Sequence, residues 1–168
     1  MTESFTGVER KYYPSGKLES EVFVNDGIRE GEYKEYHENG KIWVICNYVD
    51  GKKHGQYKTY YHENGCELTN VNSKRENLSS TNSLGQLCEI FNYVNGQIEG
   101  EYKEYYENGC ELTNVNSKRE NLSSTNSLGQ LYIICNYIDG QIQGKFKMYH
   151  SNGQVWKNYN YVNGEKIE

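Results

Sequence analysis

The feature that most constrains this chain is a glycine that returns every ~20–25 residues along most of its length. A period of that size is typical of tandem supersecondary units, each of which packs against its neighbours. The glycines each follow an asparagine, a serine or a leucine, and they are Gly16, Gly40, Gly65, Gly85, Gly109, Gly129 and Gly153. The sequence therefore predicts a single repeat array.

Each full unit contains two runs of strand-forming residues and two turn signals. The first turn is Asn-Gly or Asp-Gly and the second is Asn-Gly, and both pairs tolerate the positive φ angles of a type I′ hairpin turn. The full units are residues 17–40, 41–65, 86–109 and 130–153, with a lead-in at 1–11 and a half unit or cap at 154–168. We expect an all-β fold, an elongated antiparallel meander of hairpin repeats in one twisted layer, shaped as a half-pipe or a solenoid.

Tyrosine supplies much of the apolar surface that this chain can bury. Hydrophobic residues make up only 35% of the sequence, but 17 residues are tyrosine. A thin sheet that is partly wet on both sides can use such side chains, because each has an apolar ring and a polar tip. The second run of each unit also begins with a glycine, which predicts a β-bulge or a close backbone approach at Gly31, Gly55, Gly100 and Gly144.

Two sets of aromatic residues recur behind these glycines. The first set is Tyr33, Tyr57, Tyr102 and Phe146, and the second is Tyr36, Tyr60, Tyr105 and Tyr149. Both sets can pack between strands, or one of them can form an exposed binding platform, since tyrosine is enriched at protein interfaces. These eight residues are the candidate partner-binding residues.

Residues 66–85 and 110–129 are identical and interrupt the array. Aligned with residues 86–109, they read as degenerate repeats that have lost their tyrosines and turn glycines. Their serines, asparagines and threonines equally favour polar loops. Both interpretations stay open. The identity itself indicates a block that was repeated either by natural duplication or by engineering.

No pattern in the sequence predicts catalysis, a metal centre or a cofactor. His37, His62 and His150 precede turns and are expected to be solvated. Cys46 and Cys135 occupy a position that other units fill with apolar residues, which predicts core packing. Glutamates recur in every unit, whereas an active site is normally unique, so they are interpreted as a solvated sheet face with cross-strand ion pairs.

The charge of the chain limits its partners. A net charge of −5 gives no general attraction to nucleic acid and disfavours anionic membranes. The N-terminal residues do not read as a secretory signal, no stretch is apolar for long enough to predict a transmembrane helix, and the five cysteines form no disulfide framework. We expect a cytoplasmic protein.

The recurrent pattern from Tyr12 to Gly164 resembles the MORN-repeat superfamily. The runs Glu-Gly-Glu-Tyr-Lys-Glu-Tyr-Tyr-Glu-Asn-Gly, at 99–109, and Val-Asn-Gly are similar to its variant repeat, found in bacterial and giant-virus proteins, including an antitoxin-like family. The resemblance implies a scaffold, a protein-binding module or a lipid-associating module. Here Gly-x-Tyr-x-x-Tyr replaces the commoner Tyr-x-Gly-x-Trp, which disfavours lipid binding.

We therefore expect a non-enzymatic module that binds or scaffolds an unidentified protein partner through a Tyr-lined sheet face. The alternatives are peripheral membrane association and antitoxin-like neutralisation of a partner.

Overall fold

The computed structural model of the chain describes residues 4–62, 85–107 and 130–167. These residues form a 13-stranded sheet. Its strands are β1 (Gly7–Tyr12), β2 (Leu18–Asn25), β3 (Ile28–Tyr36), β4 (Ile42–Val49), β5 (Lys52–Lys53), β6 (Gly55–Tyr60), β7 (Leu87–Val94), β8 (Gln97–Tyr105), β9 (Leu131–Ile138), β10 (Gln141–Ile142), β11 (Gly144–Tyr149), β12 (Val155–Val162) and β13 (Glu165–Ile167).

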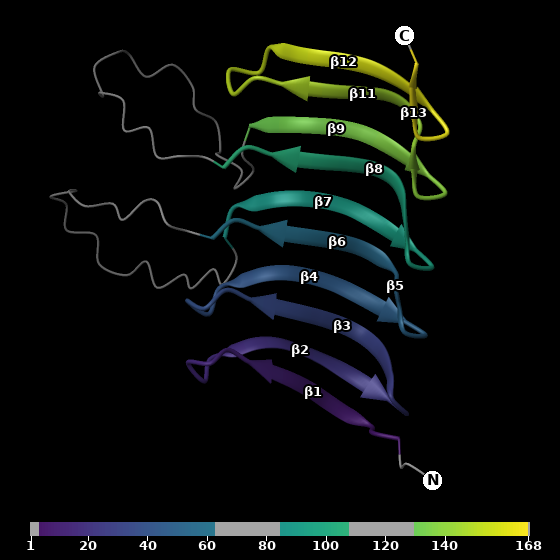
Figure 1. The fold of residues 1–168 in the computed structure, drawn as a ribbon. Helices are drawn as coiled ribbons and strands as arrows, with labels where there is room; N and C mark the ends of the chain where they lie inside the picture. Colours follow the sequence, from purple (N-terminus) through teal and green to yellow (C-terminus); the bar gives the residue numbers. More distant parts are fainter. Residues whose placement is uncertain (1–3, 63–84, 108–129, 168) are drawn as a thin grey trace, which may run out of the picture.

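The strands follow one another across the sheet in chain order, and every neighbouring pair is antiparallel. Figure 1 shows the resulting meander, with the first strand at one end and the last at the other. This confirms the predicted all-β array of hairpins. The described part of the chain contains no helix long and apolar enough to span a bilayer.

The sheet begins earlier in the chain than expected and continues across the two identical segments. β1 pairs with β2 along its length, so the sheet begins within residues 1–11, which the sequence suggested were only a lead-in. The identical segments 66–85 and 110–129 lie, apart from Gly85, outside the described residues. The sheet is continuous on either side of them, because β6 pairs directly with β7 and β8 with β9.

The two kinds of turn differ in geometry. At the first kind, an Asp or Asn with φ of 49–51° is followed by a left-handed glycine, as a type I′ hairpin requires. At the second kind, the prediction of type I′ was wrong. Asn39 has no positive φ, and the amide of Gly40 donates to the carbonyl of His37 (2.8 Å) while the amide of His37 donates to the carbonyl of Lys41 (2.8 Å). This is a wider turn, in which only the glycine is left-handed.

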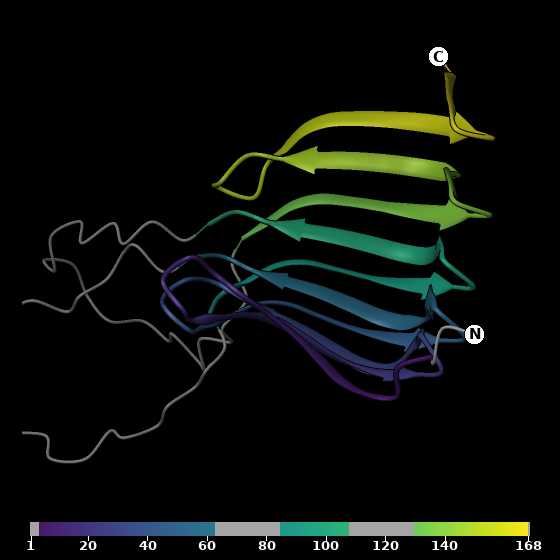
Figure 2. The ribbon, with the colours of Figure 1, turned by 60° about the horizontal axis from the view of Figure 1, so that its bottom comes forward.

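The glycine inside the second run of each unit is a bulge, as predicted. Its φ is 77–82° at Gly31, Gly55, Gly100 and Gly144. The register confirms the extra residues, because Val22 lies opposite Tyr33 but the next residue, Phe23, lies opposite Glu30. No atom lies within 4 Å of a Cβ built on these four glycines, so the backbone angle and not the available space requires glycine. Figure 2 shows the strand ends turning away from the sheet near the hairpin tips.

Each hairpin tip is fastened to the unit before it by a backbone hydrogen bond, and four of the five described tips add a bond to a side chain. The amide of Gly51 donates to the carbonyl of Arg29 (3.0 Å), and the amide of Asp50 donates to the Glu30 carboxylate (3.0 Å). The backbone bond recurs at Gly27, Gly96, Gly140 and Gly164. The acceptor side chain recurs at Thr6, Glu99 and Gln143. Within the described residues, His54 holds the equivalent position but makes no such bond to the amide of Asn95.

The opposite ends of the strands are tied together in a similar way. The hydroxyl of Tyr61 donates to the carbonyl of Tyr105 (2.6 Å), and that of Tyr106 to the carbonyl of Tyr149 (2.8 Å). Nε2 of His37 lies 3.2 Å from the carbonyl of Tyr60 and carries the hydrogen, because a carbonyl oxygen only accepts. Neighbouring units are therefore linked at both ends of their strands as well as through the backbone hydrogen bonds between strands.

We expect Gly100→Ala to lower the free energy of unfolding by ~1–2 kcal/mol, because an L side chain resists a φ of 82°. Gly100→Asn should cost less, since asparagine tolerates the left-handed region. Urea unfolding followed by tyrosine fluorescence measures both. Equal losses for the two variants would contradict a purely conformational origin.

We expect His54→Gln to raise the free energy of unfolding by ~0.5–1 kcal/mol. Glutamine at 143 already accepts a hydrogen bond from the amide of Asn163 (2.8 Å), and glutamine at 54 should do the same for Asn95. His54→Ala is the control, because alanine has no acceptor, and thermal unfolding of the three proteins is the measurement. A glutamine variant no more stable than the alanine variant would refute the proposed bond.

Candidate functional site

The two predicted aromatic sets lie on opposite faces of the sheet. Tyr33 is opposite Val22 and Cys46, whereas Tyr36 donates to the Glu21 carboxylate, and Glu21 lies opposite Lys34. Successive residues of a strand point to opposite faces, so these are two separate surfaces. We call them the aromatic face, which carries Tyr33, Tyr57, Tyr102 and Phe146, and the lysine face, which carries Lys34, Lys58, Lys103 and Lys147.

The aromatic face holds one of the two small cores of the sheet. Val22, Val24, Cys46 and Tyr48 are buried there, with Tyr33 and Tyr57 packed against them. Rings stack from unit to unit. The contacts, at centroid distances of 4.8–6.3 Å, include Tyr57–Phe91, Phe91–Tyr102, Tyr102–Tyr137 and Phe146–Tyr159.

Burial weakens the acidity of groups on this face. It raises the pKa of Tyr33 to about 12 and, as the largest cause, also raises the pKa values of Tyr57 and Tyr102. Cys46 and Cys135 are buried, as predicted, and burial raises the pKa of each thiol to about 11. These thiols are therefore core side chains with little thiolate character.

Two glutamates face each other across β7 and β8 on the aromatic face. Glu89 lies opposite Glu104, and the hydroxyl of Tyr102 donates to Glu89 (2.8 Å). Burial, and next the charge of Glu89, raise the pKa of Glu104. Both residues have equivalents in neighbouring units that are not acidic pairs. Repulsion between the two carboxylates destabilises the folded sheet at this position. Among the described strand pairs, this is the one place where two carboxylates lie directly opposite each other.

The lysine face carries a central row in which lysine and isoleucine alternate from strand to strand. Ile45 lies opposite both Lys34 and Lys58. Ile90 lies opposite Lys58 and Lys103. Ile134 lies opposite Lys103 and Lys147. We call this row, from Lys34 to Lys147, the lysine–isoleucine row.

Two of the four lysines already have a carboxylate partner. Lys34 pairs with Glu32 and Lys103 with Glu101, in each case along the same strand. The expected cross-strand ion pairs are therefore found at Arg10 and Glu21 but not at these lysines. In the other two units, glutamine or lysine replaces the glutamate. Lys58 and Lys147 consequently make no ion pair within the described residues.

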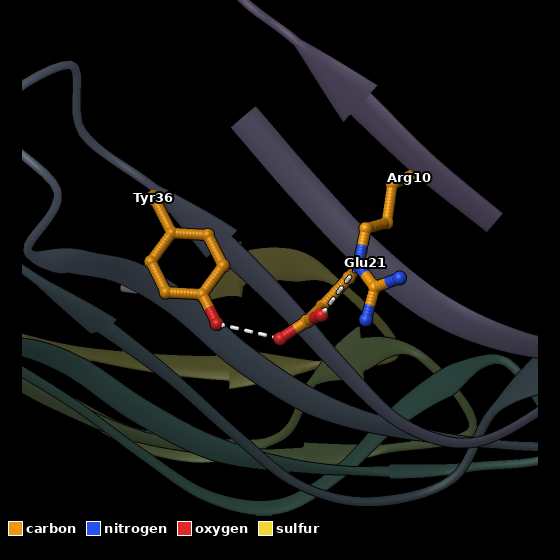
Figure 3. A network of polar contacts seen from close by, with 3 residues as sticks. All are labelled: Arg10, Glu21 and Tyr36. Carbon is orange, nitrogen blue, oxygen red and sulfur yellow. Dashed lines mark hydrogen bonds and ion pairs between the residues drawn. The ribbon is translucent and has the colours of Figure 1, made fainter. Parts of the chain in front are cut away.

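The second tyrosine set borders this row. Tyr60 is buried with Ile42 and Leu87, and Tyr36, Tyr105, Ile45 and Ile90 pack against them. In Figure 3, the Tyr36 hydroxyl donates to one oxygen of Glu21 (2.8 Å) and Nε of Arg10 approaches the other (3.3 Å). Burial, and then the Glu21 hydrogen bond, raise the pKa of Tyr36 to about 12.

All eight candidate residues are at least partly covered. Tyr60 is buried, and the other seven are half-buried. The arrangement therefore combines packing with partial access, and neither set stands free as an exposed platform.

Shallow depressions open at the two ends of the lysine–isoleucine row. One, of about 390 Å³, is lined by Arg10, Phe23 and Lys34 among others. The other, of about 330 Å³, is lined by Ile134, Lys145, Lys147 and Tyr149 among others. Nearer the hairpin tips of the same sheet lies a stripe of branched side chains, each 40–48% exposed, at Val49, Val94, Ile138 and Val162. The lysine face thus offers accessible charge and apolar surface together.

Sequence reasoning missed the lysine–isoleucine row, although its signal was present. A lysine follows the first aromatic residue in every full unit, in Gly-x-Tyr-Lys or Gly-x-Phe-Lys. Reading these lysines as generic solvated charge overlooked that one register position carries all of them.

The histidines and cysteines that the structure describes form no ligand cluster. The rings of His37 and His62 are 4.7 Å apart, and His37 also stacks on Trp43. The described ranges contain no group of three or more His, Cys, Asp or Glu side chains suited to a metal ion.

The comparisons with known proteins concern the repeat alone. The MORN repeat variant family matches residues 5–26, 29–50, 98–109 and 142–163. No curated protein and no solved structure gives a significant match.

We expect Glu104→Gln to raise the free energy of unfolding at pH 7 by ~0.2–1 kcal/mol, because it removes a like-charge pair. The folded-state pKa of Glu104 is raised, so the wild type regains this stability as the pH falls through that value. The gain should vanish below the ordinary glutamate pKa of 4.5. Urea unfolding across this pH range tests it, with Glu165→Gln as the control, because Glu165 is exposed and lies opposite Val162. A variant less stable than the wild type at pH 7 would contradict the assignment.

Proposed function

We propose that this chain, which belongs to the MORN-repeat superfamily, is a non-enzymatic repeat module that binds and scaffolds a protein partner along its lysine face. The observation that carries the proposal is the recurrence of half-buried side chains at one register, with a lysine in each of the four full units and an isoleucine in three of them. The half-buried Tyr36, Tyr105 and Tyr149 border this row. The depressions at both ends of the row support the same surface.

The form of the surface favours an extended partner. Each unit presents one lysine and one tyrosine, and a single pair of exposed charges contributes only ~0.2–1 kcal/mol. A partner that runs along several units loses its freedom of motion once, at the first contact, and then makes the remaining contacts at a high effective concentration. The half-buried tyrosines supply rigid contact area at a small loss of side-chain entropy.

The repetition also favours binding over catalysis. Catalysis needs a unique set of groups held around one reacting bond, whereas the residues of the lysine face recur in every full unit. The paired carboxylates, Glu89 and Glu104, lie on the other face, among packed rings. Antitoxin-like neutralisation would be one case of the same partner binding.

Membrane association is the weaker alternative. Glu32 and Glu101 neutralise two of the four lysines, and the chain as a whole carries a net charge of −5. Attraction to an anionic bilayer is worth only ~1 kcal/mol for each basic residue near the surface, so two unpaired lysines in the row give weak binding. We accordingly propose a cytoplasmic location, on the composition of the chain.

A random-peptide display library panned against the immobilised chain tests the proposal. We expect enriched peptides to bind the wild type and to lose at least ~10-fold in affinity with Lys58→Glu/Lys147→Glu, which reverses the two unpaired charges of the row.

The matched control is Lys11→Glu/Lys52→Glu. It changes the net charge equally, at two exposed lysines outside the row. Circular dichroism should show that both double variants retain the sheet. No enrichment over a bare support, or equal losses in the two double variants, would sink the proposed function.

A further inference from the structure

The spacing of the lysine–isoleucine row sets the period of any extended partner that lies along it. Neighbouring strands of a sheet are ~4.8 Å apart, and the lysines stand on every second strand, so successive lysines lie roughly 9.6 Å apart. The isoleucines between them repeat with the same period. The row is thus a line of evenly spaced lysine and isoleucine side chains that runs across the strands.

Among extended backbones, the polyproline II helix fits this period best. It has three residues per turn and rises 3.1 Å per residue, which gives ~9.3 Å per turn. A β-strand repeats its side chains on one face every ~6.7 Å. An α-helix returns to the same face after seven residues, or ~10.5 Å. Over three repeats the mismatch is about 1 Å for polyproline II, and about 3 Å for the α-helix.

The charges of the row indicate which residue should recur. Lys58 and Lys147 make no ion pair among the described residues, and they stand four strands apart, or roughly 19 Å. Six residues of polyproline II span about 18.6 Å. Carboxylates six residues apart can therefore meet both lysines, and one midway between them faces Lys103. The second lysine at the far end, Lys145, adds positive charge beside the depression there.

The remaining groups suit the other two residues of each turn. Ile45, Ile90 and Ile134 offer apolar surface between the lysines, against which proline rings can pack. A polyproline II backbone makes no internal hydrogen bonds, so its carbonyl groups need outside donors. Amide side chains lie two residues from the row along the same strands, and therefore on the same face, at Asn47, Gln56, Asn92 and Asn136.

From this match of period, charge and apolar surface, we propose that the lysine face binds an acidic, proline-rich peptide segment in the polyproline II conformation. The segment runs across the strands and carries a carboxylate at every third residue. This inference rests on the proposed function and adds the chemistry and the register of the partner.

Three synthetic peptides test it in fluorescence anisotropy titrations at low ionic strength. The acidic triplet peptide repeats the unit Glu-Pro-Pro four times. The acidic doublet peptide has the same composition, but it repeats the unit Glu-Pro four times and ends in a run of four further prolines. The basic triplet peptide repeats Lys-Pro-Pro four times. We expect the acidic triplet peptide to bind at least ~10-fold more tightly than the acidic doublet peptide, and the basic triplet peptide not to bind.

The variants locate the binding. Lys58→Glu/Lys147→Glu should weaken the complex with the acidic triplet peptide by at least ~10-fold, and Lys11→Glu/Lys52→Glu, with the same net charge, should weaken it by clearly less. Equal affinities for the two acidic peptides would overturn the proposed three-residue period and leave net charge as the only determinant of binding. Equal losses in the two double variants would overturn the placement on the row.

Two further outcomes separate this inference from the proposed function. Vesicles containing phosphatidylserine that bind more tightly than the acidic triplet peptide, and lose binding with Lys58→Glu/Lys147→Glu, would assign the row to a lipid surface and overturn the inference. Peptides from the display library that bind the row without a three-residue acidic period would overturn the inference while the proposed function stands.

Discussion

The left-handed glycine in the second strand of each unit is the constraint on which the rest of the sheet depends. At Gly31, Gly55, Gly100 and Gly144 the backbone leaves the regular ladder, and the chain on the N-terminal side of each glycine comes from the hairpin tip in a different direction. That change of direction brings each tip within reach of the previous unit, where the amide of Gly51, for example, meets the carbonyl of Arg29. Without the bulge, the units would lose the hydrogen bonds at the hairpin tips and would keep the strand ladders, the ring contacts and the bonds of Tyr61 and Tyr106 at the opposite strand ends.

The alternation of side chains along each strand explains how a single layer can have two cores. Tyr33 and Tyr36 stand three residues apart in β3, so they do not share a face. Tyr33 joins the buried side chains of the aromatic face, and Tyr36 joins Ile42 and Tyr60 on the lysine face. Each core is small and is shared with neighbouring units, as expected for a repeat array in which stability accrues unit by unit.

Much of the fold could be predicted from the sequence, because its signals are local. Asp50-Gly51 and its equivalents specify a type I′ turn by themselves, and an isolated glycine between strand formers indicates a bulge. The wide turn at Asn39-Gly40 was predicted with the wrong geometry, because the same dipeptide suits both turn types. The three-residue spacing of Tyr33 and Tyr36 already implies opposite faces, because side chains alternate along a strand. What the sequence left open was the packing of each face, which depends on cross-strand neighbours such as Cys46 for Tyr33 and Ile42 for Tyr36.

The same alternation of side chains explains why we propose the lysine face as the binding surface. The rings of the first aromatic set contact rings on the neighbouring strands, as Tyr57 and Tyr102 do on either side of Phe91, so they are already used in packing. On the opposite face, Lys58 and Lys103 each stand between two isoleucines, and Lys34 and Lys147 each have an isoleucine on one side. Neither side chain can satisfy the other, because an ammonium group gains nothing from an aliphatic neighbour. Carboxylates within the chain meet this need at Lys34 and Lys103. At Lys58 and Lys147 the described part of the chain supplies none, which is why we propose that a carboxylate from a partner completes the row.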